Sequence, residues 1–309
     1  MESASCKLLA MTQAKPQAPA LKIPQVLKGV RLLSLALNLP GPAALMRCQQ
    51  MGARCVKLEP PSGDPMQRYS PTAYAQLQSG IKVITVDLKT AAGQKTLHRE
   101  LAKTDVLITS FRPSAIEKLG LGWKSLHRLY PALSHVAIVG SPGARAEEPG
   151  HDLTYLADNG LVPGLELPAT LYADMSGSLA ASEAVLLAVL AQRNSRSGKG
   201  IRLEIALSSA AQYLALPRHW GLTQTSGFVG GAHAGYRVYA CKDGRVAVAA
   251  LEPHFAAALC AAAGLPASDA ASLQTQATRD AIARFLKKQT RQQLDVLAAS
   301  KDIPMHTMA

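Results

Sequence analysis

The 309-residue sequence lacks the features of a disulfide-rich, zinc-binding or membrane-spanning protein. Its five cysteines, at positions 6, 48, 55, 241 and 260, form no CxxC pair and no regular framework. That scatter argues against a disulfide scaffold and a zinc site, and it suits a reducing compartment. The uninterrupted apolar runs are far too short to cross a bilayer. The sequence therefore predicts a cytoplasmic protein with no metal centre and no membrane span.

Standard catalytic and nucleotide motifs are also absent. No GxGxxG follows a predicted strand, and there is no GxxxxGK[ST], GxSxG or HExxH. The classical dinucleotide fingerprint is therefore not indicated. Residues 1–25 contain no long apolar segment, begin with an acidic second residue and include several prolines. They do not fit a secretory signal, and we expect them to form a flexible leader.

Acidic and aromatic side chains are scarce compared with basic ones. The chain has 21 Asp and Glu against 33 Lys and Arg, a net charge of +12, and only two Trp, eight Tyr and four Phe. Its basic residues are spread along the chain and are not interleaved with aromatics, which argues against nucleic-acid binding. A phosphorylated ligand would explain the positive charge, and so would diffuse charge that maintains solubility.

Strand-like and helical segments alternate through the first two thirds of the chain. Predicted strands lie at 29–35, 53–59, 81–88, 105–110, 133–139 and 201–207, with helices at 43–51, 91–103, near 123–129 and after residue 174. The four residues 39–42 read as a turn. This alternation predicts an α/β fold with a doubly wound parallel sheet covered on both faces.

The last quarter of the chain has a different pattern. Residues 236–251 predict a β-hairpin with a K-D-G turn, and helices are expected at roughly 253–263 and 278–299. The preceding stretch, 217–235, is rich in glycine and loop-like. We therefore expect a large domain at 26–216, a linker at 217–235 and a smaller α+β domain at 236–309.

Two titratable residues lie at the edges of apolar runs and beside small residues. His151 occurs in P-G-H-D-L-T-Y-L, and Asp174 follows 23 positions later in L-Y-A-D-M-S-G-S. Such groups can approach a substrate closely, and burial can tune their pKa. The structural alternatives are equally open at this point: His151 would cap a turn, and Asp174 would N-cap the following helix.

Three further residues each allow a functional and a structural interpretation. Arg112 directly follows a predicted strand, where it would pair with a phosphate or be an ordinary surface cation. Pro42, in P-G-P, belongs to a rigid turn, and phosphate capture at the following helix N-terminus is the alternative. Glu252, in L-E-P-H-F, either caps a helix or reaches across a domain interface to orient a histidine.

Taken together, these segments resemble family III (CaiB/BaiF-type) CoA-transferases, most closely the α-methylacyl-CoA racemase-like members. The resemblance runs through L-K-G-V-R-L-L-S-L, M-G-A-R-C-V-K-L-E-P-P-S-G-D-P, D-V-L-I-T-S-F-R-P-S-A-I-E-K-L-G-L-G, P-G-H-D-L-T-Y-L and Y-R-V-Y-A-C-K-D-G-R-V-A-V-A-A-L-E-P-H-F. It spans about residues 27–305 in the family's order. It implies a CoA-binding large domain, an acyl-CoA substrate and an interlocked homodimer, with no permanently bound cofactor.

The resemblance also implies roles for individual residues. Asp174 occupies the family's shared aspartate position, and His151 stands where the racemases carry their histidine. Glu252 would orient His151, and Asp152 would support the site. Inverting a carbon acid needs two bases on opposite faces of an enolate, which a histidine–aspartate pair supplies.

The ligand-binding contacts implied by the resemblance lie elsewhere in the chain. Arg112, Lys82 and Pro42 would bind coenzyme A, with Lys82 in G-I-K where the family commonly has G-K-R. Donors in S-G-S, residues 176–178, would stabilise the enolate oxygen from the start of the helix.

Two alternatives to racemisation stay open. The first is a CoA-transferase that uses Asp174 as a nucleophile on the thioester. The second is a CoA-binding paralogue without catalysis, because Pro60 follows Glu59 where relatives commonly carry a basic residue.

Overall fold

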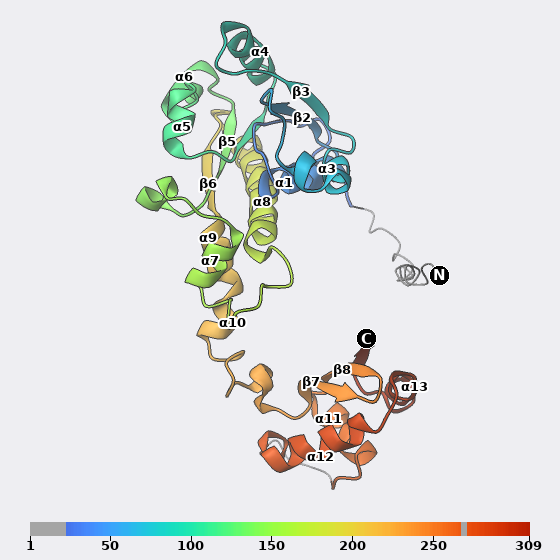
Figure 1. Ribbon diagram of the computed structural model, residues 1–309. Coiled ribbons are helices and arrows are strands. Elements are labelled where there is room, and N and C mark those ends of the chain that lie inside the picture. The colour runs from blue at the N-terminus through green and yellow to red at the C-terminus, as the bar shows by residue number, and fades with distance from the viewer. Residues whose placement is uncertain (1–22, 267–270) are drawn as a thin grey trace, which may run out of the picture. The chain divides into compact units, whose positions relative to one another are not determined.

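The computed structural model describes residues 23–266 and 271–309, which form two compact units with a boundary between Ala211 and Gln212 (Figure 1). We call them unit 1 and unit 2. The predicted leader lies outside the described residues except for residues 23–25. Residues 217–235, predicted as a loop-like linker, contain most of the short helix α10 (Leu216–His219) and a π-helical turn at Phe228–Ala232.

Unit 1 is built on a six-stranded parallel sheet with the order β3-β2-β1-β4-β5-β6. Its strands are β1 (Arg31–Ser34), β2 (Arg54–Glu59), β3 (Lys82–Thr85), β4 (Val106–Thr109), β5 (Ser134–Val139) and β6 (Arg202–Ala206). All six predicted strands are present, and the doubly wound fold is confirmed. The strand order reverses direction between β1 and β4, which is where open α/β sheets leave a crevice for ligands.

Helices cover both faces of this sheet. They are α1 (Pro40–Gln50), α2 (Met66–Tyr69), α3 (Pro71–Leu77), α4 (Ala91–Leu101), α5 (Pro113–Lys118), α6 (Trp123–Leu129), α7 (Asp152–Asp158), α8 (Tyr172–Asn194) and α9 (Leu207–Leu214), with a 3-10 turn η1 (Gly143–Glu147). Neighbouring strand residues point to opposite faces. Thus Leu32 packs with α1 and α8, whereas Leu33 packs with α4, α5 and α6.

The long helix α8 is the one helix in the described part of the chain that is long and apolar enough to cross a membrane. Half of its most apolar window, 50%, is buried. The helix packs against α1 and against strands β4, β5 and β6, and its residues Ala181 and Val185 are fully buried there. Its apolar composition thus contributes directly to the core of unit 1.

Unit 2 is a small α+β unit with an antiparallel sheet. Its elements are β7 (Tyr236–Cys241), β8 (Gly244–Ala249) and β9 (Met305–Met308), with helices α11 (Pro253–Ala262), α12 (Gln276–Lys287) and α13 (Arg291–Lys301) and the 3-10 turn η3 (Ser272–Gln274). The hairpin is present, and Cys241 pairs with Gly244 across a two-residue turn. Strand β9, which pairs with β8, was not predicted from the sequence.

The prediction of one helix over 278–299 is wrong, because a cap interrupts it. The Thr290 Oγ1 accepts a hydrogen bond from the Gln293 N–H at 3.2 Å, and the Gln293 Oε1 accepts one from the Thr290 N–H at 2.8 Å. This reciprocal capping box begins a new helix at Arg291. The continuous apolar pattern thus belongs to two helices.

The first turn of α1 lies directly against the chain that leaves β1. Residues 39–42 do not form a separate turn, since Leu39 is the N-cap and Pro40 is the first helical residue. A Cβ on Gly41 would lie 2.1 Å from the Cβ of Ala36. We expect G41A to lower the free energy of unfolding by about 2 kcal/mol, because one of the two segments must move.

Urea denaturation measures this loss, with G164A as the matched control. Apart from Gly164 and its two chain neighbours, no described residue has a heavy atom within 4 Å of a Cβ built on Gly164. An equal loss in both variants would show that the close approach at Gly41 has no energetic weight.

Candidate active site

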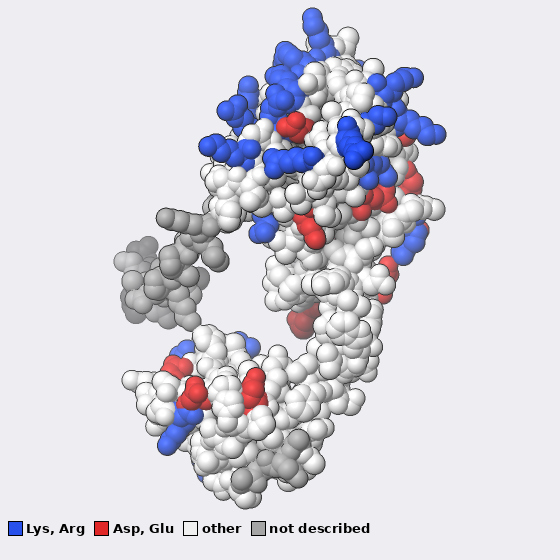
Figure 2. All heavy atoms as spheres, turned by 180° about the vertical axis from the view of Figure 1, so that it is seen from behind, with Lys and Arg blue, Asp and Glu red and all other residues white. Residues whose placement is uncertain are grey.

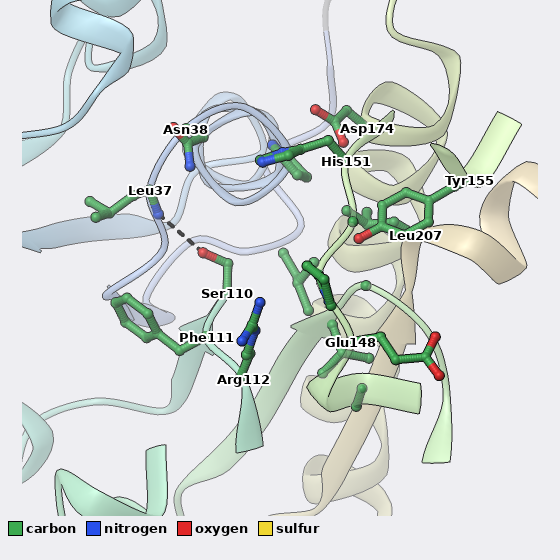
Figure 3. Close-up of a pocket in the computed structure, with 17 residues that line it drawn as sticks. Leu37, Asn38, Ser110, Phe111, Arg112, Glu148, His151, Tyr155, Asp174 and Leu207 are labelled. Carbon is green, nitrogen blue, oxygen red and sulfur yellow. Dashed lines mark hydrogen bonds between the residues drawn. The ribbon is translucent and has the colours of Figure 1, made fainter. Parts of the chain in front are cut away.

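A pocket of about 320 Å³ opens in unit 1 at the carboxyl ends of β1, β4 and β5 (Figure 3). It therefore lies at the point where the strand order reverses. Its lining residues come from the end of β5, from the loops after these strands, from the start of α1, from η1 and from α7, α8 and α9: Leu37, Asn38, Pro40, Ser110, Phe111, Arg112, Ile138, Val139, Gly140, Ala146, Glu148, Pro149, Gly150, His151, Tyr155, Asp174 and Leu207. The sheet topology thus brings His151, Asp174 and Arg112 to one cavity.

Asp174 lies in the first turn of α8 and faces the pocket. Its backbone N–H donates a hydrogen bond to Oδ1 of Asp152 at 2.9 Å. Burial, followed by the negative charge of Asp152, raises the pKa of Asp174 to about 6, while His151 acts in the opposite direction. A carboxyl with a pKa near 6 exchanges protons readily near neutral pH.

The alternative in which Asp174 caps the helix is wrong. The helix begins at Tyr172 and its N-cap residue is Leu171. The S-G-S segment therefore lies beyond the helix start. The Ser176 hydroxyl donates to the Tyr172 carbonyl and the Ser178 hydroxyl to the Met175 carbonyl, both at 2.7 Å. These hydroxyls are engaged within the helix, which contradicts their predicted placement at its N-terminus.

The raised pKa of Asp174 predicts a pH-dependent stability difference. The folded protein retains a proton on Asp174 between its ordinary pKa of 3.8 and the folded value of about 6. The free energy of unfolding therefore falls as pH rises through that window, and the cost persists above it.

We expect D174N to be more stable than the wild type by about 1 kcal/mol near pH 7.5, because it removes a partly buried charge. The two proteins should converge toward pH 3, below both pKa values, where Asp174 is protonated in both states. Thermal unfolding at both pH values measures the difference. A D174N protein that is less stable than the wild type near pH 7.5 would contradict the destabilising effect of the buried Asp174 charge.

His151 occupies the N-cap position of α7, but its backbone does the capping. Its N–H donates to Oγ1 of Thr154 at 3.1 Å, and the Thr154 hydroxyl donates to the His151 carbonyl at 2.7 Å. The imidazole also lines the pocket, near enough to Asp174 to interact electrostatically with its carboxyl (Figure 3). Within the described residues no hydrogen bond engages the imidazole. The ring is thus left available to a ligand.

Asp152 joins the starts of α7 and α8. It is the first residue of α7 and only 5% exposed, and its carboxylate holds the backbone of Asp174. It is absent from the pocket lining. Its contact therefore fixes the backbone of Asp174 from outside the pocket lining. A supporting role of Asp152 in the reaction stays a prediction.

Tyr155 is a pocket residue that the sequence reasoning missed. Its ring packs against two glycines: a Cβ on Gly140 would lie 2.4 Å from the Tyr155 hydroxyl oxygen, and one on Gly150 would lie 2.6 Å from Cε1. Burial, followed by the charge of Asp174, raises the pKa of the Tyr155 phenol. Its spacing from His151, one helical turn, was the signal that could have indicated a shared face.

Residues 27–309 match the family model that is described as CoA-transferase family III. The chain belongs to this family. It is 30% identical to the α-methylacyl-CoA racemase of Mus musculus over 270 residues, which cover 82% of this chain and 68% of that protein. It is 32% identical over 199 residues to the succinyl-CoA–D-citramalate CoA-transferase of Chloroflexus aurantiacus, covering 60% of this chain and 50% of that protein. The chain thus spans half to about two thirds of the length of these two relatives.

Solved structures of family III proteins share the fold. The crystal structure of the hypothetical protein Rv3272 from Mycobacterium tuberculosis has a TM-score of 0.78 at 24% identity, covering 91% of this chain and 83% of that one. A CaiB/BaiF family protein from Brucella suis has a TM-score of 0.75 at 22% identity, covering 92% and 84%. The predicted family resemblance is confirmed. Because racemases and CoA-transferases both occur among the relatives, family membership leaves the reaction open.

Among the described residues that line this pocket, Arg112 is the one Lys or Arg side chain. It is the N-cap residue of α5, three residues after the end of β4, and it lines the cavity together with Glu148. Figure 2 shows Lys and Arg side chains gathered over the upper part of the view, which is unit 1. Exposed basic residues on and next to α4, α5 and α6 contribute: Lys95, Arg99, Lys103, Lys118, Lys124 and Arg128. Unit 1 holds 23 of the 33 Lys and Arg in its 211 residues and unit 2 holds the other 10 in 98 residues, so the basic residues are spread over both units at similar density.

The other predicted binding residues lie away from the cavity lining. Pro42 is buried in the first turn of α1, and Pro40 lines the pocket in its place. Lys82 is exposed at the first position of the edge strand β3, at the amino end of the sheet. Their roles in binding coenzyme A stay predictions.

Glu252 belongs to unit 2, where it is exposed and occupies the N-cap position of α11. Its side chain makes no capping hydrogen bond, although its carbonyl accepts one from the Ala256 N–H at 2.9 Å. Orientation of His151 by Glu252 stays a prediction. Among the described residues no group of three or more His, Cys, Asp or Glu side chains gathers as for a metal ion.

Proposed function

We propose that this family III protein racemises the α-carbon of a 2-methylacyl-CoA by proton transfer through an enolate. The observation that carries the proposal is that His151 and Asp174 line one pocket, with the pKa of Asp174 raised to about 6. Racemisation needs one group that accepts a proton while another donates one on the opposite face. An imidazole and a carboxyl that line the same pocket supply two such groups, and either one can donate or accept the proton.

In one direction, neutral His151 accepts the α-proton. The C–H bond breaks, its electron pair enters the enolate, and an N–H bond forms on the imidazole. The protonated carboxyl of Asp174 then returns a proton to the other face of the α-carbon. Asp152 holds the backbone of Asp174 during this exchange through the 2.9 Å contact. Arg112 would pair with the phosphates of coenzyme A, which enters only as part of the substrate.

The second candidate is CoA transfer with Asp174 as the nucleophile. It is supported by the same carboxyl, which lies in the pocket, and by the transferase among the relatives. The carboxylate of Asp174 would attack the thioester carbonyl, form a mixed anhydride and release the CoA thiolate. The thiolate would then attack the aspartyl carbonyl, release the donor acid and leave an enzyme–CoA thioester for the acceptor acid.

Incubation with 2-methylbutanoyl-CoA in deuterated water separates the two reactions. Deuterium uptake at the α-carbon without an added acceptor acid supports racemisation. Trapping on Asp174 by hydroxylamine, without deuterium uptake, selects transfer. Binding of the thioester with neither reaction would select the non-catalytic paralogue, and both enzymatic proposals would fail.

We also propose a homodimer, which the family resemblance implies in an interlocked form. Support comes from apolar side chains exposed along α8: Met175 at 40%, Leu179 at 50%, Leu187 at 50% and Leu190 at 53%. A second copy of the chain would cover this apolar surface. Light scattering should give a particle mass of twice the 32.6 kDa of one chain. The cytoplasmic location expected from the sequence stays a prediction.

A further inference from the structure

A buried charge cluster, formed by Lys57, Glu59 and Asp64, lies at and beyond the carboxyl half of β2. The Nζ of Lys57 is 2.5 Å from Oδ2 of Asp64 and 2.8 Å from Oε1 of Glu59. Lys57 is 0% exposed, Asp64 2% and Glu59 4%. The Tyr74 hydroxyl donates to Glu59 at 3.1 Å. None of these side chains lines the pocket. Buried ion pairs gain little stability over apolar packing, so the cluster calls for another explanation.

The Asp64 carboxylate connects this cluster to two backbone segments. Its Oδ1 accepts hydrogen bonds from the Asn38 N–H at 3.0 Å and from the Met66 N–H at 2.9 Å. Its Oδ2 is held by Lys57. One carboxylate therefore fastens the loop between β1 and α1 to the start of α2, and Lys57 fixes the orientation of that carboxylate.

The loop that Asp64 holds forms an edge of the pocket. Asn38 lines the cavity, is exposed and has a φ of +65°, a left-handed conformation that asparagine adopts more readily than most non-glycine residues but less readily than ordinary backbone angles. The preceding Leu37 N–H donates to Oγ of Ser110 at 3.2 Å, a contact drawn in Figure 3. Two side chains from outside the loop thus accept hydrogen bonds from its backbone: Asp64, which follows β2, and Ser110, which follows β4. Strained backbone of this kind persists only where its surroundings enforce it.

We propose that Asp64, fixed by Lys57 and Glu59, is a positioning residue that holds Asn38 in its left-handed conformation and so preforms the β1–α1 edge of the pocket for the ligand. The inference rests on the proposed function only in taking a CoA thioester as that ligand. Without Asp64, Asn38 would relax toward ordinary backbone angles and the ligand would have to restore the edge on binding. Affinity would fall, whereas proton transfer in the bound state would be spared.

The test compares D64A with D105A. Asp105 also accepts a backbone N–H of the β1 segment, that of Arg31 at 2.7 Å, but at the opposite end of the strand from the pocket. D64A leaves Lys57 paired with Glu59, so no buried charge loses its counterion. Calorimetric titration with 2-methylbutanoyl-CoA and saturation kinetics of α-deuterium uptake measure Kd, KM and kcat for both variants.

We expect D64A to raise Kd and KM about tenfold with kcat changed less than threefold, and D105A to leave both constants within twofold. Equal effects of the two variants, or a loss confined to kcat, would overturn the positioning role. Amide hydrogen exchange of the wild type tests the contact without a variant. The exposed Asn38 amide should be protected through Asp64, and rapid exchange would also overturn the proposal. This exchange result is independent of whether the wild type binds a CoA thioester, so failure of the proposed function remains distinguishable.

Discussion

Replacing Asp174 with asparagine is expected to lower α-deuterium uptake by about a thousandfold, within the range that a positioned acid or base contributes to catalysis. Asparagine preserves the size of the side chain and its backbone N–H contact with Asp152. It cannot take up or release the proton in the accessible pH range. The stability gain near neutral pH expected for the same variant excludes unfolding as the cause.

Asp158 provides the matched control for this substitution. It is an exposed carboxylate in α7 that pairs with Arg145 at 3.1 Å and does not line the pocket. D158N should retain deuterium uptake within twofold, because exposed ion pairs contribute little. A D174N protein with uptake within tenfold of the wild type would exclude Asp174 from the proton transfer, while hydroxylamine trapping tests separately whether it is the nucleophile of the transfer reaction.

Replacing His151 with alanine should separate the two candidate reactions. We expect H151A to reduce α-deuterium uptake at least a hundredfold, because one of the two proton-transfer groups is lost. Hydroxylamine-sensitive acyl transfer onto Asp174, where it occurs, should stay within about fivefold, since nucleophilic attack requires only the carboxylate. The start of α7 should persist, because the backbone of His151 and the Thr154 hydroxyl form its cap.

The control for this variant is H306A, which removes an exposed imidazole from β9 in unit 2. It should leave deuterium uptake unchanged. The decisive measurement is the ratio of deuterium uptake to acyl transfer in H151A and the wild type. A ratio that stays constant would remove His151 from the chemistry and leave transfer as the better assignment.

Most elements of the fold were predictable from local sequence patterns. Short apolar runs bounded by turn residues identified the six parallel strands, and alternation identified the β7–β8 hairpin. The short helices α2, α3, α5 and α7 were not predicted. Two further errors lie where a helix begins. The cap at Thr290 divides one apolar pattern into α12 and α13, and α8 begins two residues before Asp174. Strand β9 forms by pairing with β8, which is distant in the sequence.

The candidate site was predictable in part. The motif around His151 and the family position of Asp174 identified both residues before their common pocket was known. Tyr155 was not identified, because its importance depends on packing between Gly140 and Gly150. Asp64 could not be identified either, since its contact with Asn38 joins residues 26 positions apart.

By itself, the sequence determined the parallel α/β class and the family, and it made His151 and Asp174 candidate site residues, because those inferences follow from local patterns and ordered motifs. Only the tertiary structure decided that His151, Asp174, Arg112 and Tyr155 share one cavity, since the strand order brings distant loops to the same sheet edge. It also decided the pKa of Asp174 and the support of Asn38 by a buried charge cluster. Burial and Coulomb interactions depend on distances in space, which the spacing of residues along a chain does not contain.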